Sequence, residues 1–154
     1  MLLHLTHFIY FFGLVCWIGG IVFFSFFATP VIFSHLDREK AGEVVGAIFP
    51  RYYMVGYVCA AMTLPCLLIS ADNLLGPKQI FLFVMIVAWF CAGLFVGPKA
   101  RSLKAKIKFA RSTEEQEPLE AQFKTQHSLA VKLNGIALLA GLGLLWFSVA
   151  AIRL

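Results

Sequence analysis

The amino-acid sequence predicts an all-α fold: a four-transmembrane-helix bundle with helical cytoplasmic extensions of helices 3 and 4. Three observations carry this prediction: 60% of the 154 residues are hydrophobic, only 14% are charged, and the mean hydropathy is +0.84. Soluble domains average about 45–50% apolar and about 25% charged residues, and a chain this short could not bury so much hydrocarbon away from water. We therefore expect residues 1–154 to form a single integral-membrane domain. Disordered, collagen-like and nucleic-acid-binding classes are excluded.

Four segments are long and apolar enough to cross a bilayer, at about residues 5–33, 53–70, 80–96 and 130–152. A helical span needs roughly 20 apolar residues, and an open sheet would leave backbone groups unpaired in lipid. The first segment has no basic residue before it and exceeds the about 7–15 apolar residues of a cleavable signal peptide, so we expect it to stay in the membrane. Pro30 and Pro65 are the expected kink sites.

The basic residues predict the orientation. Eleven of the thirteen Lys and Arg residues lie in or beside the first and third connections, and only Lys78 and Arg153 lie on the other side. The positive-inside bias therefore places both connections in the cytoplasm and both termini outside a cell membrane, the inner or plasma membrane.

The two cytoplasmic connections are expected to be partly helical. A short interfacial helix beginning at Arg38 should lead into the second span. In the third connection, about residues 97–129, a basic half precedes an acidic half, and we expect two helical extensions that fold back on each other. Ser112 and Glu115 have capping-box spacing, and the fourth helix is expected to begin near Pro118. The basic half should attract anionic lipid at the cytoplasmic face, at roughly 1 kcal/mol per cation; a solvated, topology-setting loop is the alternative.

No Asp, Glu or Arg lies at the centre of a span, which disfavours a proton-coupled pump or charge-translocating carrier. Asn134 is the conspicuous polar residue of the fourth span, and its amide should face the bundle and find a partner. His127 precedes it by seven residues and so lies on nearly the same stripe. Two interpretations stay open: an interhelical hydrogen bond that fixes packing, or a polar pocket at the cytoplasmic end. The candidate pocket residues are His127, Asn134, Tyr52, Arg51 and His35.

Two further sets could bind a metal. His4 and His7 share a helix face at the outer end and could hold a metal or haem, or simply meet water and headgroups. His7 and His127 are separated by the bilayer, about 30 Å, and cannot share one ion. Cys59, Met62 and Cys66, at i, i+3 and i+7, line one face of the second span. Soft sulfur ligands favour Cu(I)-like ions, although such residues at helical spacing also serve as packing.

Several stretches carry a resemblance. They are His7, Trp17-Ile18-Gly19-Gly20, Phe23-Phe24, Pro30, Phe33, Leu36 to Gly42, Phe49-Pro50-Arg51-Tyr52-Tyr53 and the later Pro98, His127 and Asn134. In order and spacing they resemble the transmembrane protein 205-like family, a domain of unknown function. The resemblance implies a four-span membrane protein without an established enzyme activity, and one member is associated with cellular resistance to platinum drugs. A more distant likeness, to small membrane proteins of haem biosynthesis and copper resistance, would make His7 a ligand.

The expected function is that of a non-enzymatic membrane protein, without a cofactor, that handles a small or soft-metal solute or assists a membrane partner. The alternative is an oxidoreductase that binds haem b or copper through His7. Expected partners are the lipid bilayer and, through glycine-rich helix faces, a second copy of the chain; no nucleic acid is expected.

Overall fold

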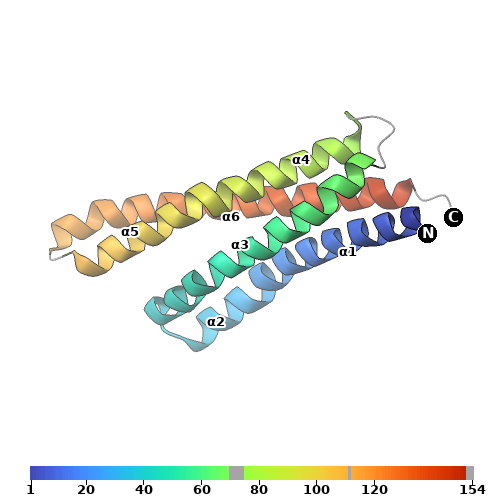
Figure 1. Ribbon diagram of the computed structural model, residues 1–154. Coiled ribbons are helices and arrows are strands. Elements are labelled where there is room, and N and C mark those ends of the chain that lie inside the picture. Colours follow the sequence, from blue (N-terminus) through green and yellow to red (C-terminus); the bar gives the residue numbers. More distant parts are fainter. Residues whose placement is uncertain (70–74, 111, 152–154) are drawn as a thin grey trace.

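The computed structural model describes residues 1–69, 75–110 and 112–151. Four helical stretches are long and apolar enough to cross a membrane: Leu2–His35, Arg38–Ile69, Pro77–Phe109 and Thr113–Ala150. They lie lengthwise against one another, and the first helix begins at the same end of the bundle at which the last one finishes (Figure 1). The predicted all-α four-helix architecture is confirmed, and so are the helical extensions of the third and fourth helices.

Two of the four stretches change their winding part-way. The first consists of α1 (Leu2–Val22), the π-helical η1 (Phe23–Ala28) and α2 (Thr29–His35), and the second is α3 (Arg38–Ile69). The third consists of α4 (Pro77–Phe90), the π-helical η2 (Cys91–Val96) and α5 (Gly97–Phe109), and the fourth is α6 (Thr113–Ala150).

Each π-helical segment ends just before a proline. The backbone N–H of Thr29 reaches the carbonyl of Phe24, and that of Gly97 reaches Ala92, both five residues back; Pro30 and Pro98 come next. A proline ring collides with the carbonyl four residues earlier in an α-helix, and a wider π-turn moves that carbonyl away. The chain thus accommodates a proline in two spans by local rewinding.

The expected helix start at Arg38 is confirmed, and the structure differs from the sequence-based expectation in two other respects. α3 is one continuous helix from Arg38 to Ile69 that includes Pro50 and Pro65, so the expected separate interfacial helix is absent from this described stretch. α6 begins at Thr113, five residues before Pro118, because the Ser112 hydroxyl caps it by accepting from the Glu115 backbone N–H at 3.3 Å. The capping-box prediction was right and the predicted start near Pro118 was wrong.

Large side chains fill the centre of the bundle. Trp17 of α1 and Trp89 of α4 are each 1% exposed and meet edge to face, with ring centroids 5.6 Å apart. Gly56 of α3 lies directly under the Trp89 indole, and a Cβ at this position would overlap the ring. At the end that carries the chain termini, the Tyr10 hydroxyl lies 2.7 Å from Ser148 Oγ and joins α1 to α6.

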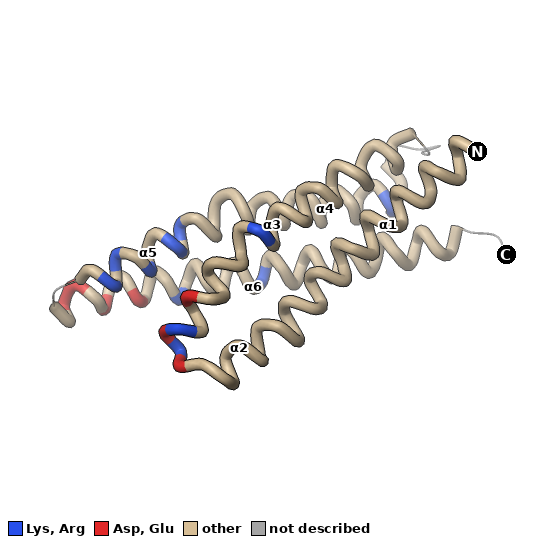
Figure 2. The backbone as a smooth tube through the Cα atoms, turned by 60° about the horizontal axis from the view of Figure 1, so that its bottom comes forward, with Lys and Arg blue, Asp and Glu red and all other residues tan. Residues whose placement is uncertain are grey.

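Charge is concentrated at the opposite end of the bundle, away from the helix ends near the N- and C-termini (Figure 2). There the tip formed by α2 and the start of α3 diverges from the tip formed by α5 and the start of α6 (Figures 1 and 2). One ion pair bridges the two tips: Lys108 Nζ of α5 lies 2.9 Å from Glu43 Oε1 of α3. We call this the charged end.

Candidate functional site

Asn134 of α6 forms hydrogen bonds with two consecutive tyrosines of α3. The Tyr52 hydroxyl donates to Asn134 Oδ1 at 3.0 Å, and Asn134 Nδ2 donates to the Tyr53 hydroxyl at 3.0 Å. The same amide nitrogen also donates to the Ala130 carbonyl at 2.8 Å, one turn earlier in α6. The amide is thereby held in one orientation, and it fixes the register of α6 against α3.

The α4 helix joins this network through Trp89. Its indole N–H donates to the Tyr53 carbonyl at 3.1 Å, and its ring centroid lies 4.8 Å from that of Tyr52 and 5.2 Å from that of Tyr53. Tyr53 is 2% exposed. The polar groups therefore lie against aromatic rings, in surroundings where a hydrogen bond is stronger than in water and an unpaired polar group is costly.

Both π-helical segments contact the tyrosines. Phe24 of η1 packs against the Tyr52 ring, with ring centroids 4.7 Å apart. Gly93 of η2 lies against Tyr57 and Tyr53, and a Cβ there would overlap the Tyr57 hydroxyl and approach the Tyr53 ring to 2.9 Å. π-helical turns are frequent at functional sites because they redirect side chains and backbone groups. Here they line two sides of one group of tyrosines.

Tyr57 follows Tyr53 by one helical turn, and its hydroxyl is in a different situation. The oxygen is buried and has no hydrogen-bond partner among the residues that the structure describes. Arg101 of α5, half-buried, reaches the Tyr53 ring: a Cβ at Gly97 would lie 3.5 Å from Arg101 Nη1 and 3.6 Å from Tyr53 Cε2. Its charge is also near enough to act on Tyr57, one turn further along α3. We call Tyr52, Tyr53, Tyr57 and Asn134 the polar cluster. Its Tyr57 hydroxyl has hydrogen-bonding capacity that the described residues leave unused.

A cavity of about 390 Å³ lies between the start of α3 and α5, nearer the charged end than Tyr57 is. Arg101 belongs to its lining, so one cation connects the cavity with the polar cluster. The full lining is Glu39, Gly42, Glu43, Gly46, Arg101, Lys104, Ala105, Ile107 and Lys108. Cavities of about 300–1,000 Å³ are of the size that small ligands occupy.

The ion pair at the rim of this cavity perturbs both of its partners, which lie outside the apolar segments. The hydrogen bond from Lys108 lowers the pKa of the Glu43 carboxyl, and the charges of Lys108 and Lys104 act in the same direction. The pKa of Lys108 is raised by the same hydrogen bond, by the Glu43 charge and by Glu39. Between the two titrations the pair is fully ionised.

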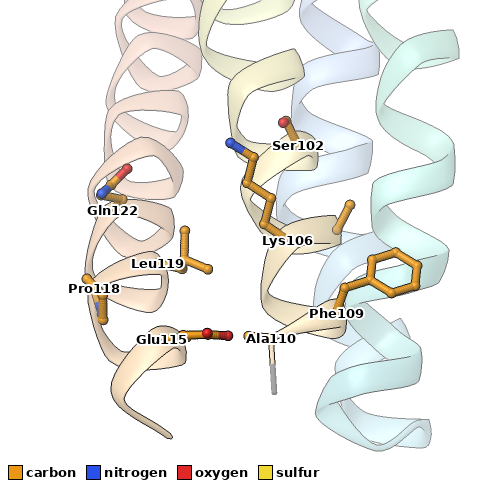
Figure 3. A pocket seen from close by; sticks show the side chains of 9 residues that line it. Ser102, Lys106, Phe109, Ala110, Glu115, Pro118, Leu119 and Gln122 are labelled. Atoms are coloured by element: carbon orange, nitrogen blue, oxygen red, sulfur yellow. The ribbon is translucent and has the colours of Figure 1, made fainter. Parts of the chain in front are cut away.

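A second cavity, of about 600 Å³, lies between α5 and α6 near their tips. Figure 3 shows its lining side chains coming from both helices, with Lys106 and Phe109 on α5 and Glu115 and Leu119 on α6. Phe109 is 81% exposed. The lining of this second cavity mixes apolar and charged groups, and no residue of the polar cluster belongs to it.

Of the five residues of the predicted polar pocket, the structure brings Tyr52 and Asn134 together. The other three are exposed. The His127 ring stacks on Phe123 within α6, with centroids 6.0 Å apart, and His35 Nδ1 lies 3.0 Å from the Val31 carbonyl and 2.9 Å from Ser34 Oγ. Arg51 points away from the cluster because it neighbours Tyr52 on a helix, where successive side chains diverge by about 100°.

The residues predicted as metal ligands are distributed over two places. His4 and His7 are both exposed near the start of α1. Cys59 and Cys66 are buried in α3, and Met62 between them packs beside Gly13 of α1. Within residues 1–69, 75–110 and 112–151, no group of three or more His, Cys, Asp and Glu side chains is arranged to hold a metal ion.

Sequence reasoning missed the importance of Tyr53, Tyr57, Trp89 and Arg101. The sequence shows Tyr53 only within the stretch that carries the family resemblance, and Arg101 only among the basic residues that predict the orientation. One sequence signal was available: Tyr53 and Tyr57 are four residues apart and therefore share a helix face. Nothing in the sequence shows that Trp89 and Arg101, on another helix, meet that face.

A family described as a domain of unknown function, DUF4149, matches residues 12–108, which include α3 with its tyrosines, both π-helical segments and Arg101. The chain belongs to this family. The match confirms the expectation of a domain of unknown function, and it ends before Asn134.

One relative in this comparison is an uncharacterised protein of Aquifex aeolicus (strain VF5), 32% identical over 83 residues. The alignment covers 54% of this chain and 60% of that protein, so the chain spans less than two thirds of the relative's length. No solved structure matches the chain.

Proposed function

We propose that this chain is a non-enzymatic membrane protein that binds a small polar ligand at the Tyr57 corner of the polar cluster. One observation carries the proposal: the Tyr57 hydroxyl is buried without a hydrogen-bond partner among the described residues, beside Arg101. A buried hydroxyl without a partner costs about 1–3 kcal/mol. A ligand that supplied a hydrogen-bond acceptor or donor to the Tyr57 hydroxyl would recover that free energy, and this recovery would favour binding.

The neighbouring groups support a binding role. The cluster offers hydroxyls and one amide, and the neighbouring Trp89 offers an indole N–H; all of these groups donate or accept hydrogen bonds. Arg101, which makes no ion pair among the described residues, adds a permanent positive charge. Such groups hold and orient a solute.

The orientation of the bundle belongs to the same proposal. Charged residues are concentrated at the end that holds the cavity (Figure 2), and positively charged loops favour the cytoplasmic side. The cavity then opens to the cytoplasm, both termini lie outside, and the bundle resides in a cell membrane. A ligand would enter the cavity from the cytoplasm or from the cytoplasmic leaflet.

Ligand-induced stabilisation of the purified protein in detergent tests the proposal. A panel of small anions, neutral polyols and amino acids is added, and the melting temperature is followed. At least one solute should raise the melting temperature of the wild type, because binding to the folded state stabilises it by mass action. Tyr57→Phe and Arg101→Gln should each abolish that shift. Tyr10→Phe removes the hydroxyl of the fourth tyrosine, which lies outside the cluster. This control variant should keep the shift in melting temperature.

Two results would contradict this function. The first is a panel in which no solute changes the wild-type melting temperature. The second is a shift that survives Tyr57→Phe and Arg101→Gln as fully as it survives Tyr10→Phe.

Soft-metal handling is a second candidate, and one structural observation favours it. Cys16 of α1, exposed, lies near the buried Cys59 of α3, so two thiols come from different helices to one part of the bundle. Thiolates are preferred ligands of Cu(I)-like ions. The resemblance to the transmembrane protein 205-like family, with its member associated with platinum resistance, points in the same direction.

Elemental analysis of the purified protein tests this candidate and the His7 alternative together. Stoichiometric copper that is lost in Cys16→Ser/Cys59→Ser but kept in Cys91→Ser would support soft-metal binding. A Soret band, or copper that is lost in His7→Ala, would instead support the haem or copper oxidoreductase. A colourless, metal-free sample after copper(I) loading contradicts both.

A further inference from the structure

The cavity between the start of α3 and α5 is lined by charges of both signs. Glu39 and Glu43 stand on the α3 side, and Lys104 and Lys108 on the α5 side. Glu43 and Lys108 form the 2.9 Å ion pair described above and neutralise each other. The guanidinium of Arg101, which also belongs to the lining, turns away toward the polar cluster. One cation, Lys104, and one carboxylate, Glu39, therefore remain.

The ammonium group of Lys104 lies about one turn of α3 from Glu39. Lys104 Nζ lies over Gly42, 2.7 Å from where a Cβ at that position would stand, and the Lys104 side chain is half-buried. Glu39 precedes Gly42 by three residues, and side chains at this spacing are neighbours on one helix face, about 5–6 Å apart. Neither Lys104 nor Glu39 makes an ion pair with any residue that the structure describes. The wall of the cavity thus offers an ammonium group and a carboxylate close to each other, each open to a ligand.

The cavity also has free space and apolar surface beside these two charges. Its volume is about 390 Å³. Gly46 lines it one turn further along α3, toward the apolar part of that helix, and a Cβ there would meet nothing within 4 Å. Ala105 and Ile107 of α5 contribute apolar side chains to the lining. The matching ligand carries a negative and a positive group close together, next to an apolar part.

The level of the cavity in the bundle indicates where such a ligand comes from. α2 still exposes large apolar side chains, with Val31 57% and Phe33 45% exposed. The start of α3, which follows α2 after Leu36 and Asp37, already carries charged residues (Figure 2). In a bilayer, lipid headgroups border the hydrocarbon on each side. The cavity therefore lies at the level of the headgroups.

We propose that the cavity between α3 and α5 binds the headgroup of phosphatidylethanolamine, with the lipid phosphate on Lys104 and the lipid ammonium group on Glu39. The Lys104 ammonium group donates a charge-assisted hydrogen bond to a phosphate oxygen, and the lipid ammonium group donates one to the Glu39 carboxylate. The two charged groups of this headgroup are joined by a short ethanolamine linker, which suits partners about one helical turn apart. No residue of the polar cluster lines the cavity, so this inference goes beyond the proposed function and does not depend on it.

The Glu39 carboxylate decides which lipid fits. Phosphatidylglycerol offers the same phosphate but brings no cation to Glu39. Phosphatidylcholine brings a quaternary ammonium group, which has no N–H donor. The primary ammonium group of phosphatidylethanolamine has three N–H donors, as a lysine side chain does, and satisfies the carboxylate by hydrogen bonding.

The test measures the melting temperature of the purified full chain in a neutral detergent, at constant ionic strength. The probes are short-chain phosphatidylethanolamine, phosphatidylcholine and phosphatidylglycerol, together with soluble phosphoethanolamine, which is the headgroup without acyl chains. Glu39→Gln and Lys104→Gln each remove one of the two charges. Glu117→Gln and Lys99→Gln, both outside the cavity lining, remove equal charges as matched controls. Gly42→Ala should displace Lys104 while favouring the helix, so it remains informative if Lys104→Gln does not fold.

We expect phosphatidylethanolamine to stabilise the wild type with an apparent affinity about tenfold higher than that of phosphatidylcholine, because a hydrogen bond to a charged group contributes roughly this factor. Glu39→Gln should remove that preference and leave the affinity for phosphatidylglycerol unchanged or higher. Lys104→Gln and Gly42→Ala should weaken the binding of phosphatidylethanolamine by about tenfold as well. The two control variants should behave like the wild type.

Soluble phosphoethanolamine distinguishes the two sources of the headgroup. If it stabilises the wild type with the same dependence on Glu39, the headgroup by itself is recognised. If only the lipid acts, the acyl chains contribute to binding and the site is specific for the membrane lipid. Both results support the proposed contacts.

The inference is overturned if phosphatidylethanolamine has no effect, or if phosphatidylcholine stabilises the wild type equally. Stabilisation by phosphatidylglycerol alone would also overturn it, because Glu39 would then have no role in binding. The same holds if Lys99→Gln weakens the binding of phosphatidylethanolamine as much as Lys104→Gln does, since the effect would then reflect net charge and not the cavity.

Discussion

Tyr52 and Asn134 are 82 positions apart in the sequence and are joined by a 3.0 Å hydrogen bond between the tyrosine hydroxyl and the amide oxygen. Tyr57, five residues after Tyr52 on the same helix, carries a hydroxyl that is buried without a partner among the described residues. The two hydroxyl groups are chemically identical, but that of Tyr52 is hydrogen-bonded and that of Tyr57 has no partner among the described residues. The difference separates the part of the polar cluster that holds the helices together from the part available for a ligand.

Removing the hydroxyl should therefore lower stability at Tyr52 but not at Tyr57. Tyr52→Phe loses the hydrogen bond to Asn134 and should lower the free energy of unfolding by about 1 kcal/mol. Tyr57→Phe removes an unpaired buried oxygen and should leave stability unchanged or raise it by up to about 1 kcal/mol. Reversible unfolding in mixed micelles, without added ligand, measures both. Equal destabilisation by the two substitutions would show that Tyr57 has a partner in the folded protein.

Two glycine substitutions should distinguish a glycine packed against a neighbouring helix from a glycine that faces open space. Gly56→Ala places a methyl group against the buried Trp89 indole and should destabilise the protein by about 1–3 kcal/mol. Gly135→Ala, in α6, meets nothing within 4 Å and should stabilise its helix by up to about 1 kcal/mol. Melting temperatures of the two variants check this. If Gly56→Ala were as stable as Gly135→Ala, the packing of α3 against α4 would be wrong.

The ion pair at the charged end should depend on pH in a defined way. The pKa of Glu43 is lowered, so its contribution is present above the ordinary value of 4.5 and is lost as the pH falls through the lowered value. The pKa of Lys108 is raised, so its contribution is present below 10.5 and is lost as the pH rises through the raised value. A double-mutant cycle with Glu43→Gln and Lys108→Gln should show coupling throughout this window.

High salt should reduce that coupling, because both side chains are exposed and screened by ions. Lys104 and Glu39 also act on the pair, so the cycle is repeated in Lys104→Gln and Glu39→Gln backgrounds. Coupling that persisted below pH 2 would exclude Glu43 as the anionic partner.

Cysteine labelling checks the proposed orientation. In a background without the four native cysteines, Ser112→Cys at the charged end should react only with a membrane-permeant maleimide in intact cells. Lys78→Cys, at the start of α4 near the opposite end, should also react with an impermeant reagent. The reverse pattern would place the charged end outside the cell and would exclude a ligand that arrives from the cytoplasm.

The sequence by itself determined the class of fold and the places of the helices. Long uncharged segments have no stable position outside a bilayer, and this local property is readable from composition alone. It also indicated that Asn134 needs a partner, because an unpaired amide in hydrocarbon is costly. The helix start at Thr113 was also within reach, since the Ser112–Glu115 cap is a matter of short spacing.

Only the tertiary structure decided which groups meet. Tyr52 and Tyr53 face Asn134, Trp89 reaches the Tyr53 carbonyl, and Arg101 lies beside Tyr57, all through contacts between helices far apart in the sequence. A periodic pattern specifies which residues share a face of one helix, but the rotation and depth of each helix against its neighbours depend on how side chains interlock. The grouping of these residues is therefore a property of the packed bundle.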